Sequence, residues 1–205
     1  MSLVWTAIRQ AGRDFWEEML FLLVFNAVWL LGGLFILPLP FLTFALFFTA
    51  YDIGQGKGIH FSTFFRYAGQ TWKPALVWGA ANLGALFVLW TNLNFYGQIQ
   101  SQWAAMVQIA FIGLTAAWLV TQLFALPLYP RLEKPGLRLA LRNAVIMMAR
   151  YPLAALTALL FGGLVVGISL FFAPAFAFLG GTAYIVLLCN QLAGLIVARE
   201  LGEPS

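Results

Sequence analysis

Five uncharged polar residues lie within long apolar runs and are the residues of this chain best suited to bind a solute: Asn26, Asn82, Gln122, Asn190 and Gln191. Carboxamides in such surroundings can hydrogen-bond the hydroxyl groups of a neutral solute, or can hold one helix against another. Asn190 and Gln191 form the densest polar spot, on which the other three could converge from other helices. A solute site and interhelical bonding both stay open.

Other chemistry is poorly represented. The single cysteine excludes an intrachain disulfide or a cysteine-based metal cluster, and the single histidine, His60, excludes a bis-histidine site within one chain. The run Gly54-Gln55-Gly56-Lys57-Gly58 lacks the spacing of a phosphate-binding loop and indicates a flexible turn. We therefore expect no catalytic residue, no metal, no cofactor and no enzymatic activity.

The composition places these residues in a membrane. Of 205 residues, 62% are hydrophobic and only 9% are charged, whereas a soluble domain carries roughly 25% charged residues. A soluble protein of this size could not cover its surface with so few charges. The chain is predicted to be an all-α integral membrane protein with one domain over 1–205.

Six transmembrane helices fit the apolar runs, since a crossing needs about 20 residues. Leu37-Pro38-Leu39-Pro40 divides the first run, because proline disrupts a helix interior but suits its first turn. The second span is short and could be re-entrant instead. The expected spans are 19–37, 39–54, 74–91, 103–129, 152–172 and 177–198.

Three amphipathic segments, 2–18, 59–73 and 136–150, are expected to lie at the membrane surface. In the third, Arg138 and Arg142 stack one helical turn apart opposite an apolar face. This basic face could contact anionic lipid headgroups, gaining about 1 kcal/mol per residue. It could alternatively dock a partner protein.

The charges orient the chain. With six crossings, all eleven basic and seven acidic residues lie on one side, which the positive-inside rule identifies as the cytoplasm. Both termini are therefore expected inside. Because the charges lie at or beyond the ends of the spans, the pattern also disfavours proton-coupled transport. The net charge of +4 is explained by topology, so nucleic-acid binding is not expected.

Gly163 and Gly167 form a GxxxG motif in the fifth span, which permits close helix packing. We expect them to pack within the chain, with dimerisation as the alternative.

Several short motifs resemble those of a known family: Asn26-Ala-Val-Trp29-Leu-Leu, Leu37-Pro38, Thr43, Gly56-Lys57-Gly58, Phe64-Phe65, Asn94-Phe95-Tyr96 and Pro130. In these motifs the chain is similar to the YesL-like family of bacterial multi-pass membrane proteins, which has no established catalytic residues. The resemblance implies a bacterial plasma (inner) membrane protein. Because members often accompany carbohydrate uptake systems, it also implies an accessory or transport-related role.

These observations predict a non-enzymatic component of a membrane assembly, accessory or structural, linked to carbohydrate uptake. A small permease or channel for a neutral solute is the alternative. The expected partners are the lipid bilayer, anionic lipid headgroups and membrane-protein subunits.

Overall fold

A computed structural model describes residues 3–171 and 180–202 of the chain, and every regular element within these ranges is a helix. The elements are α1 (Leu3–Glu17), α2 (Met19–Gly33), α3 (Leu39–Gly54), α4 (Phe61–Gln70), α5 (Trp72–Gly97), α6 (Gln102–Leu128), the 3-10 turn η1 (Tyr129–Arg131), α7 (Leu137–Arg150), α8 (Pro152–Phe171) and α10 (Thr182–Glu200). The all-helical prediction is confirmed for this part of the chain.

Helix α10 forms the centre of the helical body and contacts α1, α2, α3, α6 and α8. Leu187, Leu188 and Leu192 on α10 are fully buried. Helices α1 and α8 flank it, since the ring centroid of Tyr184 lies 6.0 Å from that of Phe15 on α1 and 6.2 Å from that of Phe161 on α8. A side chain just before α10 would disrupt this packing.

That position is Gly180, which has φ +98°, where a Cβ would lie 2.7 Å from the Phe15 ring. Glycine suits it because an L side chain rarely adopts this conformation.

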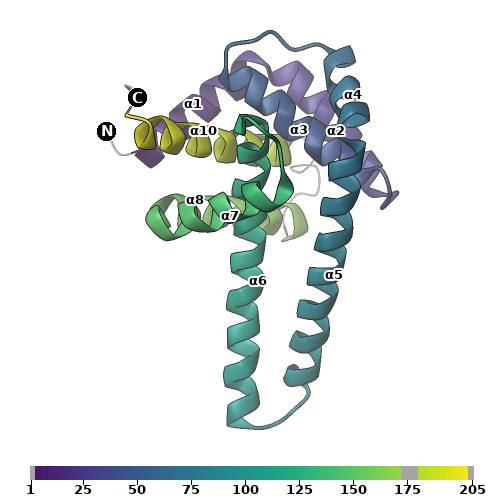
Figure 1. The fold of residues 1–205 in the computed structure, drawn as a ribbon. Coiled ribbons are helices and arrows are strands. Elements are labelled where there is room, and N and C mark those ends of the chain that lie inside the picture. The colour runs from purple at the N-terminus through teal and green to yellow at the C-terminus, as the bar shows by residue number, and fades with distance from the viewer. Residues whose placement is uncertain (1–2, 172–179, 203–205) are drawn as a thin grey trace.

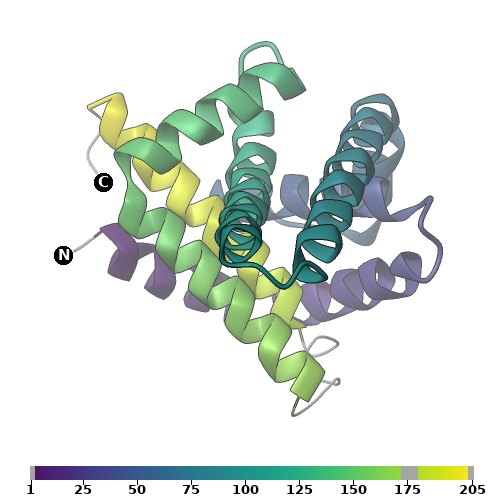
Figure 2. The same ribbon diagram turned by 90° about the horizontal axis from the view of Figure 1, so that it is seen from below.

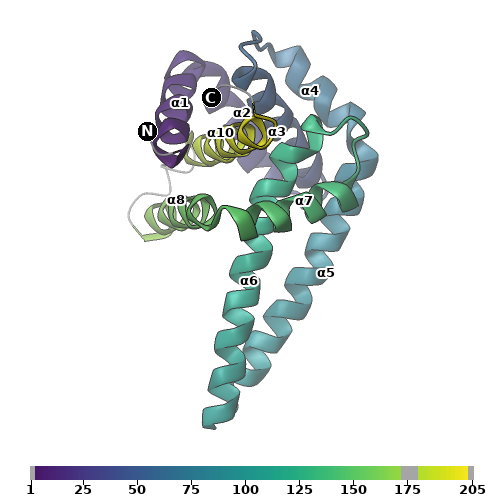
Figure 3. The same cartoon turned by 60° about the vertical axis from the view of Figure 1, so that its left-hand side comes forward.

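The α5–α6 hairpin projects away from the body (Figures 1 and 3). At 1.5 Å per residue, each of its helices measures about 40 Å, and its turn lies far from the remaining helices. Figures 1 and 2 show α8 and α10 running across the long axis of the hairpin rather than along it.

Most predicted helix positions are close to the observed ones. The proline-rich break separates α2 from α3, which begins at Leu39 with Pro40 in its first turn. Trp29 Nε1 of α2 donates to Thr43 Oγ1 of α3 at 2.9 Å, which fixes this hairpin. Position 172 of the predicted 152–172 span and positions 177–179 of the predicted 177–198 span lie outside the described residues.

The predicted end of the third span at position 91 is wrong. Helix α5 continues to Gly97 because Thr91, Asn92 and Asn94 each bond the backbone carbonyl four residues earlier, at 2.8 Å. Polar side chains that bond their own helix in this way leave its backbone ladder intact.

The membrane-protein assignment is supported by four described helices long and apolar enough to cross a bilayer: α5, α6 with η1, α8 and α10. Helices α1 and α2 would count as a fifth span if taken together, but they meet at a bend of 92°. Helix α3 is apolar but has only 16 residues. Six crossings are therefore not confirmed and stay a prediction.

The packing of α1 against α10 conflicts with the predicted positions of these two helices relative to the membrane. Leu3 and Val4 border the same pocket as Arg199 near the end of α10, and Phe15 contacts Tyr184 near its start. Helix α1 thus lies antiparallel along most of α10. A surface helix cannot follow a membrane-crossing helix over this length, so the two predictions cannot both hold.

Candidate functional site

A polar pocket of about 310 Å³ lies between the C-terminal half of α1, the end of α3 and the middle of α10. We call it the α1–α3–α10 pocket. Its lining consists of Gln10, Arg13, Asp14, Glu17, Glu18, Ile53, Gly54, Gly56, Lys57, Gly58 and Gln191. It therefore includes one of the five carboxamides singled out in the sequence.

Glycine lets α3 approach α10 here. A Cβ on Gly54 would lie 3.0 Å from Asn190 Nδ2 and 3.5 Å from Gln191 Nε2, so a larger residue would push these amides away. The next glycine, Gly56, has φ +68°, and its N–H donates to the Ile53 carbonyl at 2.9 Å. This left-handed residue ends α3 and turns the chain along the rim of the pocket.

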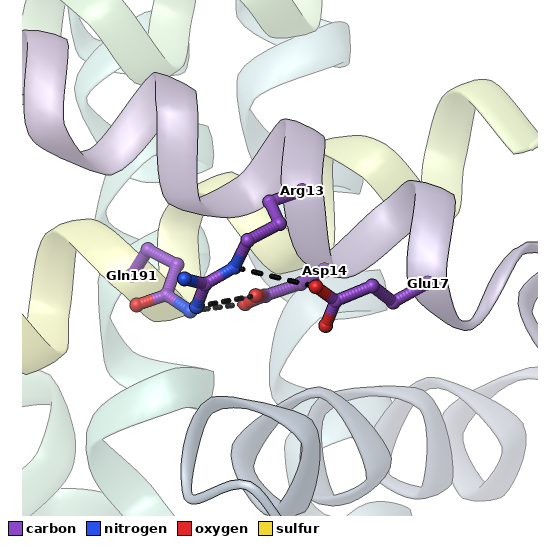
Figure 4. Close-up of polar contacts among 4 residues, drawn as sticks. All are labelled: Arg13, Asp14, Glu17 and Gln191. Atoms are coloured by element: carbon purple, nitrogen blue, oxygen red, sulfur yellow. Dashed lines mark hydrogen bonds and ion pairs between the residues drawn. The ribbon is translucent and has the colours of Figure 1, made fainter.

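Asp14 is the most buried charged group of the pocket, with 4% of its surface exposed. Figure 4 shows it pointing from α1 toward Gln191 of α10, whose Nε2 donates to its Oδ2. Its Oδ1 lies 3.5 Å from Arg13 Nη2, and Arg13 Nε lies 3.7 Å from Glu17 Oε1. A buried carboxylate requires such partners, so Gln191 and Asp14 tie α1 to α10.

The lysine of the glycine-rich turn is not free to bind phosphate. Lys57 Nζ lies 3.1 Å from Asp52 Oδ1, and the hydroxyl of Tyr67 on α4 donates to the other oxygen of Asp52. The pKa of Tyr67 is raised to about 12 by burial, and further by the hydrogen bond and charge of Asp52. The segment is thus a turn, as predicted, but it is held to α4 through Asp52 rather than flexible.

The pocket offers donors and acceptors of both signs. Arg13 and Lys57 face three carboxylates and the Gln10 and Gln191 amides. Among the described residues, no group of three His, Cys, Asp or Glu side chains is placed to hold a metal ion. Such a mixed lining suits a neutral polar or zwitterionic molecule better than an anion or a metal.

A second polar centre surrounds Asn190, which is fully buried. Its Nδ2 donates to the Ala50 carbonyl of α3 at 2.7 Å, and its Oδ1 accepts from Arg131 Nη1 at 2.6 Å. The Arg131 guanidinium lies 4.9 Å from the Tyr51 ring centroid and approaches Gly194, where a Cβ would lie 3.1 Å from Nη2. This centre braces α3, η1 and α10 against one another.

A third polar set lies between α5 and α6. Gln122 Oε1 accepts from Trp78 Nε1 at 2.8 Å and from Asn82 Nδ2 at 3.5 Å, while Trp118 Nε1 donates to Asn82 Oδ1 at 3.1 Å. Gln122 Nε2 is buried and has no hydrogen-bond partner among the described residues. Asn82 Nδ2 also donates to the Trp78 carbonyl of its own helix at 2.9 Å, so hydrogen bonds within α5 and between α5 and α6 account for the other polar atoms of this set.

The five predicted carboxamides therefore fall into three places. Asn82 and Gln122 are together in the hairpin. Asn190 and Gln191 are neighbours on α10 and both face Gly54. Asn26 on α2 is buried against the start of α10, where its Oδ1 accepts from the Ala183 backbone N–H at 3.1 Å.

The predicted basic face lies on α7. Arg138 and Arg142 are exposed, while Ala140, Ala144 and Met147 form the buried face. This agrees with an amphipathic helix, and the contact of its basic face with lipid or with a partner protein stays a prediction.

The GxxxG motif does not pack as expected. A Cβ on Gly163 or Gly167 would meet no atom within 4 Å among the described residues. Close packing within this part of the chain is thus not seen, because no described helix approaches that side of α8. Dimerisation through the motif stays a prediction.

Sequence reasoning missed Asp14 and Arg131. Asp14 follows Ala7 and Ala11 at helical spacing, and these three are the buried residues of α1; this spacing was a usable signal. Arg131 had none, since its partners Tyr51 and Asn190 are remote in the chain.

Comparisons with family models, curated proteins and solved structures found no match to this chain.

Proposed function

We propose that this chain is a non-enzymatic multi-pass membrane protein that serves as an accessory or structural component of a membrane assembly. The observation that carries the proposal is the α5–α6 hairpin, whose outward surface is apolar over the middle of both helices. Leu83, Phe87, Val88, Met106 and Ile109 are all exposed along it. Such a surface requires lipid or an apolar partner around it.

The hairpin has the dimensions of a crossing. Exposed Trp72 and Trp90 on α5 are separated by about 27 Å of helix, close to the 30 Å of a hydrocarbon core. Tryptophans favour the two interfaces of a bilayer. No charged residue lies between Lys73 and Arg131, so nothing in the hairpin opposes insertion.

Its polar interior supports a structural role rather than transport. Its two indoles and two carboxamides form most of their hydrogen bonds with one another, and these bonds fix α5 against α6. Interhelical hydrogen bonds of this kind contribute about 0.6 to 2 kcal/mol each. A hairpin braced internally presents a fixed outer surface to a neighbouring membrane protein.

The cellular setting rests on the sequence. The charge bias supports cytoplasmic termini, and the family resemblance alone supports a bacterial plasma (inner) membrane and a link to carbohydrate uptake. We propose no cofactor.

Two topologies compete within this proposal. The charge distribution supports six crossings with both termini inside. The pairing of α1 with most of α10, across the hairpin axis, supports two crossings by α5 and α6 with the remaining helices at the cytoplasmic interface. Both place Phe95 outside, but only six crossings place the α2–α3 turn there.

Cysteine labelling distinguishes the topologies. In a Cys189→Ala background, a membrane-impermeant maleimide applied from outside should label Phe95→Cys in both cases. Labelling of Phe35→Cys supports six crossings, and protection of it until the cytoplasmic side is opened supports two.

The accessory role is tested by mild extraction from the native membrane and native mass spectrometry. A stoichiometric protein partner is expected, and Phe87→Ala with Ile109→Ala should reduce it. Leu160→Ala, at an exposed position on α8, is the matched control and should leave the partner bound. A chain that always purifies alone would contradict the proposal.

A permease for a neutral solute is the second candidate, favoured by the unpartnered Gln122 Nε2 and by the mixed lining of the α1–α3–α10 pocket. It predicts flux of a neutral sugar or polyol into proteoliposomes that falls with Gln122→Leu or Gln191→Leu. Flux no greater than in empty liposomes would exclude it.

A further inference from the structure

A second pocket, of about 360 Å³, lies where the start of α1, the start of α8 and the end of α10 meet. We call it the α1–α8–α10 pocket. Leu3, Val4 and Leu153 supply apolar walls, and Arg150 and Arg199 supply two guanidinium groups. The combination is that of an amphipathic binding site.

The charge balance at this pocket is positive. Glu200 Oε2 lies 2.9 Å from Arg150 Nη1, and Glu200 Oε1 accepts from the Tyr151 hydroxyl at 2.7 Å. That hydrogen bond, more than any other influence, raises the pKa of Tyr151. Both oxygens of Glu200 are thus engaged, and no carboxylate in the described part of the chain forms an ion pair with Arg199. Among residues 3–171 and 180–202, one positive charge is therefore left uncompensated beside the apolar walls.

An apolar stripe leads away from this charge along α8. Leu153, Leu156, Leu160 and Leu164 are 71%, 51%, 68% and 55% exposed, and their spacing of three and four residues places them on one helix face. The stripe begins at the pocket wall, so a ligand with its charged end in the pocket would meet apolar side chains beyond it.

We propose that the α1–α8–α10 pocket binds the headgroup of an anionic phospholipid. Arg199 and Arg150 hold the phosphate, and one acyl chain lies along the leucine stripe of α8. Guanidinium groups suit this ligand because they bind phosphate oxygens with paired N–H donors. The site differs from the basic face of α7, where Arg138 and Arg142 are exposed and border neither of the two pockets described here.

This inference rests on the membrane location of the chain, but not on six crossings or on an accessory role. Lipid binding is measured on the purified full chain, so its outcome is separate from the search for a partner protein.

The test is native mass spectrometry of the full chain in mild detergent, titrated with phosphatidylglycerol or phosphatidylcholine. We expect preferential retention of one phosphatidylglycerol. Arg199→Gln should weaken it about fivefold, the effect of one basic residue on an anionic lipid. Arg138→Gln removes the same charge from the exposed face of α7 and should leave retention unchanged.

Equal weakening by both variants would overturn the proposal, because the lipid would then respond to net charge alone. Unchanged retention in Arg199→Gln would overturn it too. Leu160→Gln should also weaken retention. Inorganic phosphate at millimolar concentration should not displace the lipid; if it does, the pocket takes a free phosphate instead.

Discussion

The contacts of Asn190 make it the position where a near-isosteric substitution should be most destabilising. Asn190→Leu keeps the number and branching of the side-chain heavy atoms while removing two hydrogen bonds, from Arg131 Nη1 at 2.6 Å and to the Ala50 carbonyl at 2.7 Å. The substitution places the Arg131 guanidinium beside an apolar side chain, and it leaves the Ala50 carbonyl without the Asn190 Nδ2 donor.

The magnitude follows from the two bonds. A hydrogen bond to a charged group contributes about 2 kcal/mol and one between neutral groups about 1 kcal/mol. We therefore expect Asn190→Leu to lower the free energy of unfolding by about 3 kcal/mol. For a chain of this length that corresponds to roughly 10 °C in the melting temperature.

The assay is thermal and denaturant unfolding in mild detergent, followed by circular dichroism, as a double-mutant cycle with Arg131→Met. Arg131 also donates to the Pro127 and Asn190 carbonyls, so Arg131→Met destabilises by itself. The bond between the two side chains can be lost only once, however, so the double variant should lose less stability than the sum of the two single variants. Asn92→Leu is the control, because the described hydrogen bond of the half-buried Asn92 is exposed and is made to its own helix. The reasoning is refuted if Asn190→Leu changes stability no more than Asn92→Leu, or if the two substitutions add.

Three further predictions use the same unfolding assay. Gly54→Ala should destabilise by about 1 to 2 kcal/mol because its Cβ would displace buried amides, whereas Gly58→Ala, with no atom within 4 Å of its Cβ, should not; equal effects would contradict the close approach. Tyr67, whose folded pKa is raised to about 12, stabilises fully below pH 10 and loses this contribution as the pH rises from 10 through 12. Tyr67→Phe should remove the part of the alkaline loss of stability that is due to this hydroxyl. An unchanged dependence of the unfolding free energy on pH would contradict the role of Tyr67. Trp118→Phe should cost about 0.6 kcal/mol by removing the bond to Asn82, and no measurable loss would indicate that the hairpin interior is not braced there.

The sequence predicted the helices well because their limits are set by local chemistry. Proline disrupts a helix interior but suits its first turn, so Pro38 and Pro40 separate α2 from α3. An apolar run of about 20 residues has few alternatives to a helix. The extension of α5 to Gly97 was missed because the polar residues there bond back to their own helix, a choice that composition does not reveal.

Helix pairing was less predictable, because it depends on contacts between residues far apart in the chain. The approach of α3 to α10 depends on Gly54 facing two amides, and the bracing of η1 depends on Arg131 reaching over Gly194. Neither glycine is distinctive in the sequence. For the same reason the five carboxamides could be identified individually, but not assigned to three separate places.

The uncharged hairpin also has a consequence for how the chain enters a membrane. Translocating one elementary charge through a potential of 100 mV involves about 2.3 kcal/mol, but between Lys73 and Arg131 there is no charge to move. The α5–α6 turn can therefore pass through the bilayer without electrical work. Its insertion during synthesis should be unaffected by collapsing the membrane potential, which protease protection of the newly made chain can measure with and without an uncoupler.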